Sequence, residues 1–214
     1  MGNGGRRSRI QDRDAANAGE TATRSQAPRD EAFDALTPPS IPSGARAGIG
    51  FDAHRLEAGR RLRLGGVTFP DEPRGLAGHS DGDAALHALI DALLGAAHLG
   101  DIGTLFPPDE ERWRHADSAH LLRLTVQRLI GSGWRPRVAD LVIVADAPTI
   151  HPVRDRVEAR IAELLGLDST RVSVKGTTSD GLGIAAGGGV AAYALATIEP
   201  APPPRRPRSN QENP

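Results

Sequence analysis

The densest group of residues able to do chemistry is in residues 78–87, where two histidines and two aspartates precede an apolar run. Ser80 and Asp83 have the S-x-x-D spacing of a helix start, in which the serine accepts a hydrogen bond from an early backbone N–H. Asp83, His87 and Asp91 then recur every fourth residue and are expected to share one stripe of that helix. A stripe of acid, imidazole and acid is costly to bury unless it binds something, and a divalent metal is the expected ligand.

Asp52 and His54 form a second group, directly after residues 47–51, which are predicted to be a short buried strand. Alternation along a strand places both side chains on the same side. Such a pair can hold one ion from two directions, and it also fits an aspartate that caps a turn beside a solvent-facing histidine. Combined with His87, the pair completes a two-histidine, one-carboxylate set that suits Zn²⁺ and leaves a fourth position for a substrate oxygen. In that arrangement Asp91 would orient a ligand from one turn further along the helix.

A third pattern, G-T-T-S-D-G-L-G, occupies residues 176–183. Small residues let backbone N–H groups approach an anion closely, and the hydroxyl groups add further donors. The pattern favours phosphate binding, although it differs from the P-loop motif, and an ordinary glycine turn accounts for it equally well.

The spacing of apolar residues predicts helices and strands that alternate along the chain. Three helices are expected, over about 83–97, 118–130 and 153–165. Short apolar or alternating segments are expected to be strands: 47–51, 62–64 paired with 67–69, 138–145, 171–175 and 190–198. Residues 70–78, rich in proline and glycine, are expected to be a loop. The pattern predicts an α/β fold, an α+β two-layer sandwich in which a mixed sheet carries the three main helices on one face.

The last predicted strand is rich in alanine at positions 191, 192, 194 and 196. These side chains are too small to make a thick layer. We therefore expect them on the open face of the sheet, where another subunit would pack against them.

Composition and charge limit the remaining possibilities. Both ends of the 214-residue chain, residues 1–45 and 200–214, have the composition of disordered tails and leave one domain over residues 46–199. The absence of cysteine excludes disulfides and thiolate metal sites. A formal net charge of −1 gives no case for a nucleic-acid partner. No apolar run approaches the about 20 residues of a membrane span, and no signal segment is visible, so we expect a cytoplasmic protein.

The motifs together resemble those of the 2-C-methyl-D-erythritol 2,4-cyclodiphosphate synthase family, over the whole of residues 46–199. The resemblance rests on G-F-D-A-H at 50–54, H-S-D-G-D at 79–83 with His87, L-G-D-I-G at 99–103 and T-T-S-D-G-L-G at 177–183. It implies a phosphorus–oxygen lyase of non-mevalonate isoprenoid precursor synthesis. Such an enzyme cyclises 4-diphosphocytidyl-2-C-methyl-D-erythritol 2-phosphate to the 2,4-cyclodiphosphate and releases CMP. It also implies a homotrimer with sheets facing the three-fold axis and sites between subunits. No nucleotidyltransferase pattern precedes the matching residues, so we expect the single-function form.

The resemblance also implies roles for individual residues. Zn²⁺, or another divalent transition metal, would bind Asp52, His54 and His87, while Asp180 would hold a second cation, Mg²⁺ or Mn²⁺. His79 and Thr178 would stabilise the transition state. Except for His87, substrate contacts are implied for these residues and also for Ala53, Ser80, Asp101, Ile102, Gly103, Ala145, Thr149, Ile150, His151, Gly176, Thr177, Ser179 and Ile184.

Two segments depart from the family pattern and leave alternatives open. Thr149 stands where members usually carry a lysine that helps to hold the nucleotide diphosphate. The stretch I-A-A-G-G-G at 184–189 lacks the usual arginine and glutamate. These changes motivate the alternative of a diverged, weakly active or non-catalytic trimer that binds zinc and phosphate compounds. A zinc phosphohydrolase is a third possibility, for which Asp83 or Asp91 would have to activate water.

Overall fold

The computed structural model describes residues 44–186 and 188–202, and the side chains of Ile184 and Ala186 are not described. The expected tails, 1–45 and 200–214, therefore lie almost wholly outside the described residues. The strands are β1 (Arg46–Ala58), β2 (Leu62–Leu64), β3 (Val67–Phe69), β4 (Arg74–Leu76), β5 (Trp134–Ala145), β6 (Val172–Thr177) and β7 (Gly189–Pro200). The helices are α2 (Ala84–Ala97), α3 (Ile102–Leu105), α4 (Ser118–Gly131), α5 (Arg154–Leu165) and α6 (Gly183–Ala186), and single 3₁₀ turns lie at Glu111–Trp113, His151–Val153 and Ser169–Arg171.

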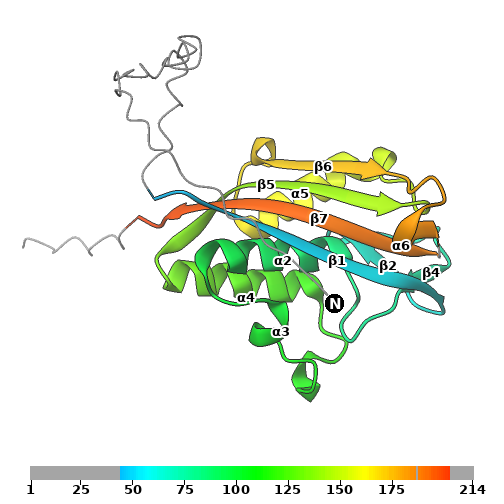
Figure 1. The fold of residues 1–214 in the computed structure, drawn as a ribbon, viewed down its shortest axis with the longest axis horizontal. Coiled ribbons are helices and arrows are strands. Elements are labelled where there is room, and N and C mark those ends of the chain that lie inside the picture. Colours follow the sequence, from blue (N-terminus) through cyan, green and yellow to red (C-terminus); the bar gives the residue numbers. More distant parts are fainter. Residues whose placement is uncertain (1–43, 187, 203–214) are drawn as a thin grey trace, which may run out of the picture. The chain divides into compact units, whose positions relative to one another are not determined.

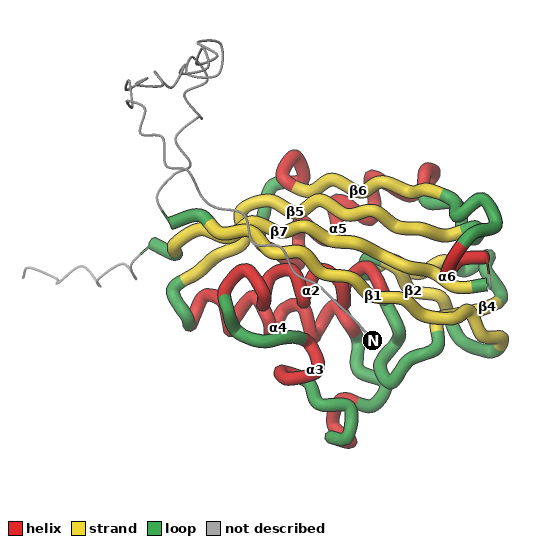
Figure 2. The backbone as a smooth tube through the Cα atoms, in the orientation of Figure 1, coloured by secondary structure: helices red, strands yellow, loops and turns green. Residues whose placement is uncertain are grey.

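Five of the described strands form a mixed sheet in the order β4-β1-β7-β5-β6. β5 and β6 are parallel, whereas β1 and β5 each pair antiparallel with β7. α2, α4 and α5 lie together against this sheet, as Figure 1 and Figure 2 show. The expected two-layer architecture is confirmed, and so is the separate β2–β3 hairpin.

The prediction of a loop over residues 70–78 is wrong in part, because β4 forms within it. Leu76 pairs with Leu56 and Gly75 with Glu57, which adds β4 to the edge of the sheet beside β1. Three residues flanked by proline and glycine carry no strand periodicity of their own. Pairing with β1, a tertiary contact, therefore decides this element.

α2 is the centre of the core. Twelve of its residues are buried, and it packs on β1 and β7. Glycines on β1 allow this close approach: a Cβ added to Gly50 would lie 2.0 Å from the carbonyl oxygen of Ala88, and one added to Gly48 would lie 2.1 Å from that of Ala92. β1 and α2 supply the first two groups of chemical residues identified in the sequence, so this contact fixes their relative position.

Replacing Gly50 with alanine is expected to destabilise the fold by about 1–3 kcal/mol, because the new methyl group must push α2 away from β1. Gly95, an exposed glycine within α2, provides the matched control, since a Cβ added there meets nothing within 4 Å. Gly95→Ala should stabilise the chain by about 0.5–1 kcal/mol. Chemical denaturation of both variants measures the two effects, and a Gly50→Ala variant as stable as the parent would contradict the packing described here.

The expected position of the alanines of β7 is wrong. Ala192, Ala194 and Ala196 are buried on the side that faces the helices, and Ala191 is buried as well. Their small size serves the close approach of α2, which is the same requirement that Gly50 meets on β1. The open face of the sheet instead carries large apolar side chains, which include Ile49, 74% exposed, and Phe51, Val138, Tyr193 and Leu195. The rings of Phe51 and Tyr193 lie 4.8 Å apart there.

Candidate active site

Asp52, His54 and His87 converge as the spacing predicts. Asp52 and His54 project from the same side of β1, and His87 reaches them from the second turn of α2. The Oδ2 atom of Asp52 lies 2.8 Å from Nε2 of His54 and 2.8 Å from Nδ1 of His87, and the two nitrogens are 3.4 Å apart. Among the described residues, these three form the group of metal-ligating side chains found with all ligand atoms within 4.8 Å of one another. The alternative of a solvent-facing turn at Asp52 and His54 does not hold.

The charges of the triad suit a cation. Burial opposes ionisation of Asp52, but the hydrogen bonds and charges of His54 and His87 outweigh it and hold the pKa of the carboxyl well below its usual range. Burial also opposes the charged form of His87, yet the Asp52 carboxylate raises the pKa of the imidazole overall. An ionised carboxylate and two imidazole nitrogens, set around one point, are the donors that three-ligand zinc sites use.

Asp83 does not belong to this site, contrary to the expected metal stripe. It is fully buried and accepts hydrogen bonds from the backbone N–H groups of Gly65 (2.8 Å), Gly66 (2.7 Å) and Leu86 (3.1 Å). Asp83 is thus the N-cap of α2, and it also ties the β2–β3 turn to the helix. The stripe is interrupted because a cap residue has non-helical backbone angles and turns its side chain back to backbone amides.

Asp83→Ala is expected to destabilise the chain by about 2–3 kcal/mol, because it removes a helix cap and leaves buried N–H donors without an acceptor. The exposed Asp109 provides a control whose replacement by alanine should change the free energy of unfolding by less than about 0.5 kcal/mol. Urea unfolding monitored by circular dichroism measures both. Equal stabilities would mean that the cap contributes nothing.

Ser80 and Asp91 also take positions that the spacing alone does not predict. Ser80 does not cap the helix; its hydroxyl accepts from the backbone N–H of Gly82 and lies 3.1 Å from Nε2 of His87. Asp91 accepts a 2.7 Å hydrogen bond from the backbone N–H of Ile102 and so anchors the start of α3. Asp91 also lines the cavity beside the triad, and no hydrogen bond joins it to a triad side chain in the described part of the chain.

A cavity of about 260 Å³ opens beside the triad. The predicted substrate-binding residues that line it are Asp52, His54, His79, Ser80, Ile102 and Gly103. The ring of His79 also forms a hydrogen bond with the carbonyl group of Pro108. Asp101 caps α3 next to Ile102, and Ala53 lies on β1 between the two ligands. The sequence reasoning missed an apolar wall made by Phe106, Pro108, Trp113 and Leu121, which lacks a local signal because apolar residues in loops and helices have many other uses.

A second cavity, of about 150 Å³, is lined by seven of the other predicted contacts. It lies where β5 and β6 end side by side, since parallel strands bring their carboxyl ends to the same edge of a sheet. Gly176 allows the loop after β5 to close over it, because a Cβ there would lie 2.7 Å from Cβ of Ile150. The lining includes Ala145, Thr149, Ile150, His151, Gly176, Thr177 and Thr178.

The adjoining loop carries the predicted ligand of a second cation, Asp180. Its carboxylate accepts a 2.8 Å hydrogen bond from the Thr178 hydroxyl, and its backbone is left-handed, with φ of 49°. The side chain of Ser179 is directed instead to Asp146, whose carboxylate accepts from both the Ser179 N–H and hydroxyl. The predicted contact Ile184 lies in α6, but its side chain is outside the described residues.

The two cavities lie apart from each other in the described part of the chain. Asp52 of β1 pairs with Ala192 of β7, Ala192 with Ile143 of β5, and Ile143 with Gly176 of β6. Three strand-to-strand steps place Asp52 and Gly176 about 14 Å apart across the sheet. The predicted site residues thus form two groups that share no cavity among the described residues. The first, the metal group, surrounds the triad; the second, at the ends of β5 and β6, was predicted to contact the nucleotide and is called the nucleotide group.

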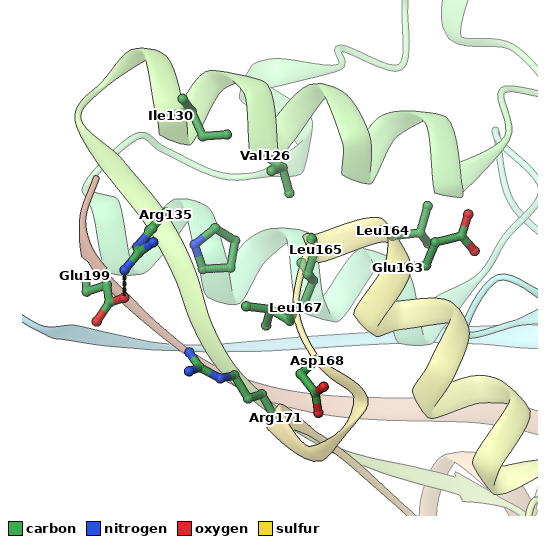
Figure 3. A pocket seen from close by; sticks show the side chains of 12 residues that line it. Val126, Ile130, Arg135, Glu163, Leu164, Leu165, Leu167, Asp168, Arg171 and Glu199 are labelled. Carbon is green, nitrogen blue, oxygen red and sulfur yellow. Dashed lines mark ion pairs between the residues drawn. The ribbon is translucent and has the colours of Figure 1, made fainter. Parts of the chain in front are cut away.

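A larger cavity, of about 510 Å³, lies elsewhere, between the ends of α4 and α5 and the start of β5 (Figure 3). It contains none of the predicted site residues. Three of its charged side chains are engaged in ion pairs: Arg135 pairs with Glu199 at 2.7 Å, and Glu163 pairs with Arg160 at 2.7 Å. Its larger volume alone therefore does not make it a candidate active site.

In the part of the chain that the structure describes, no helix is long and apolar enough to cross a membrane.

Comparison with known proteins identifies relatives that match the residues forming both cavities. The model of the YgbB family matches residues 45–199. The chain is 51% identical over 152 residues to the 2-C-methyl-D-erythritol 2,4-cyclodiphosphate synthase of Symbiobacterium thermophilum, a match that covers 71% of this chain and 96% of the relative. It is 49% identical over 154 residues to that of Moorella thermoacetica, covering 72% and 94%.

Solved structures agree with the sequence relatives. A 2C-methyl-D-erythritol-2,4-cyclodiphosphate synthase in a CDP-bound form superposes with a TM-score of 0.67 at 42% identity, covering 72% of this chain and 100% of that one. A CDP complex of IspF from Plasmodium falciparum gives a TM-score of 0.64 at 31% identity, covering 74% and 98%. The chain belongs to the YgbB family, the family of the 2-C-methyl-D-erythritol 2,4-cyclodiphosphate synthases.

Proposed function

We propose that the chain catalyses the metal-dependent cyclisation of 4-diphosphocytidyl-2-C-methyl-D-erythritol 2-phosphate to 2-C-methyl-D-erythritol 2,4-cyclodiphosphate, with release of CMP. The observation that carries the proposal is the convergence of Asp52, His54 and His87 beside a substrate-sized cavity. The names of the relatives, half of whose residues are identical over this domain, support the same reaction.

The reaction needs positioning and charge neutralisation more than a covalent nucleophile. An oxygen of the 2-phosphate attacks the β-phosphorus, a new P–O bond forms, and the bond from the β-phosphorus to the bridging oxygen breaks, so that CMP leaves with that electron pair. Attack within one molecule gains most from a fixed geometry. The chain would supply it by holding the methylerythritol end against His79, Ser80 and the α3 segment, and the nucleotide in the second cavity.

The donor sets also indicate the cofactors. Asp52, His54 and His87 would hold Zn²⁺, and Asp180 would hold Mg²⁺ or Mn²⁺, a harder ion that prefers carboxylate oxygen. When bound, these cations neutralise charge on the phosphate oxygens. The hydroxyl of Thr178, two residues from Asp180, and the ring of His79 would donate hydrogen bonds to the charge that develops there.

We further propose that the chain acts as a homotrimer with its sheets facing the three-fold axis. The apolar side chains of the open sheet face, Ile49, Phe51, Tyr193 and Leu195 among them, need a cover that the described chain does not provide. The separation of the two cavities supports the same assembly, because the metal group of one subunit would complete the nucleotide group of its neighbour.

Thr149 lines the nucleotide cavity. A threonine where the family usually has a lysine would therefore change the affinity for the nucleotide rather than the metal group.

One assay tests the reaction. The full chain is incubated with the diphosphocytidyl substrate and Mg²⁺, and the phosphorus NMR spectrum identifies the products. Two coupled resonances of a cyclic diphosphate, together with CMP, support the proposal, and EDTA should abolish both. A linear hydrolysis product would indicate a phosphohydrolase instead, and binding without turnover would indicate the diverged trimer.

A further inference from the structure

Ser118, at the start of α4, contacts His87 of the metal group through its hydroxyl. It is fully buried, and its hydroxyl oxygen lies 2.9 Å from Nε2 of His87. Nδ1 of the same ring faces Asp52. One nitrogen of His87 is therefore directed to the metal group. The other, Nε2, is directed to two hydroxyls, that of Ser118 at 2.9 Å and that of Ser80 at 3.1 Å.

The direction of the hydrogen bonds around Ser118 follows from its second partner. Its hydroxyl donates a 2.5 Å hydrogen bond to Oδ1 of Asp81. Because the single hydroxyl proton of Ser118 is engaged in the hydrogen bond to Asp81, the Ser118 oxygen can only accept a hydrogen bond from His87. This order requires a proton on Nε2 of His87 and leaves the lone pair of Nδ1 for a ligand.

Asp81 is held in place by several donors of its own. Its carboxylate accepts from the backbone N–H groups of Ser118 (3.2 Å) and Asp83 (3.3 Å) and from Nη1 of Arg63 (3.3 Å). Arg63 is in turn paired with Asp117 at 3.2 Å. In all of these contacts Asp81 is the acceptor, which is consistent with its accepting from the Ser118 hydroxyl as well.

We propose that Ser118 and Asp81 are positioning residues of the metal site, which hold His87 in the tautomer and ring orientation that a metal ion requires. The inference rests on the metal site of the proposed function. Neither residue touches the ion or the substrate. Partners of this kind, behind a histidine ligand, set its basicity and direction, and their loss weakens metal binding by about tenfold to a hundredfold.

The test is metal affinity rather than activity. The full chain is stripped of metal, and its dissociation constant for Zn²⁺ is measured by competition with a chromophoric chelator. Ser118→Ala should raise that constant by about tenfold to a hundredfold. Thr125→Val provides the matched control, because Thr125 is equally buried on the same helix but its hydroxyl bonds only the carbonyl of Leu121. Its affinity should stay within about twofold of the parent.

The Asp81→Asn variant distinguishes a role of Asp81 in orienting His87 from a role in packing alone. The new amide can donate to Ser118, so the Ser118 hydroxyl can turn to donate to Nε2 and favour the tautomer with its proton on Nδ1. We therefore expect Asp81→Asn to weaken Zn²⁺ binding at least as much as Ser118→Ala. The double variant should bind no more weakly than the weaker single variant, since both changes act through one hydrogen-bonded chain. In the zinc-loaded parent, imidazole ¹⁵N NMR should show a protonated, slowly exchanging Nε2 on His87.

The outcomes distinguish a failure of the proposed function from a failure of the positioning inference alone. If the parent chain binds no zinc, the proposed function fails. If the parent binds zinc, and a folded Ser118→Ala variant binds it equally well, only the positioning inference is overturned. Equal losses in Ser118→Ala and Thr125→Val, or additive losses in the double variant, would also overturn it, because both would point to packing.

Discussion

Replacing His87 with alanine is expected to lower the rate of CMP release by about a thousandfold or more, because the variant loses a metal ligand together with the charge neutralisation that the reaction requires. The remaining ligands, Asp52 and His54, both come from β1 and lie on one side of the site. The effect should appear in kcat as well as in zinc content, since the charge to be neutralised grows toward the transition state.

Release of CMP by the purified variant, with zinc measured in the same sample, provides the test. His98, an exposed histidine at the C-terminus of the same helix, offers a control: His98→Asn keeps a residue that tolerates the left-handed backbone there and should retain parental activity. Chelation of the parent should reproduce the loss, and added Zn²⁺ should reverse it. A metal-free His87→Ala variant with parental turnover would remove the metal from the mechanism.

The second large effect is a recovery of activity. His87→Ala and Thr178→Ala are each expected to be inactive or nearly so, because one lacks a metal ligand and the other lacks the hydroxyl beside Asp180. If each site combines the metal group of one subunit with the nucleotide group of the next, mixed trimers contain some sites with both groups intact. Random assembly of equal amounts should restore about a quarter of the parental activity, since each site needs two independent correct choices.

Refolding the two variants together, and separately as controls, provides the mixed and unmixed trimers. The separate samples should remain inactive, which excludes recovery by refolding alone. Joint refolding without recovery, when native mass spectrometry shows that mixed trimers have formed, would place both groups of a working site in one subunit. The oligomeric state from the same spectra tests the proposed trimer directly.

Much of the metal group could be predicted from local sequence. The D-x-H pattern places two ligands on one side of a strand, and the apolar period that follows predicts the helix that carries His87. These features depend on residue type and spacing within one element. For the same reason, α2, α4, α5 and most strands could be predicted to within a few residues. The short helices α3 and α6 and the strand β4 were not predicted, and β1 runs seven residues past its predicted end at residue 51.

Asp83 and Ser118 show where that reasoning fails. Both Asp83 and Asp91 fit the metal stripe by spacing, but Asp83 meets the amides of a hairpin turn 17 and 18 residues earlier in the chain. Ser118 carries no motif, and its importance appears only when α4 is packed against α2. A side chain's partners across such distances depend on long-range packing, which no local period encodes.

Residue types and their spacing thus determined which groups could bind a cation, which elements carry them and to which family the chain belongs. Tertiary structure alone decided which acid caps a helix rather than faces the metal group, which face of β7 the alanines occupy, and that the predicted contacts fall into two cavities. The physical reason is that alternation assigns side chains to two sides of a strand, while only the packed helices decide which of those sides is buried.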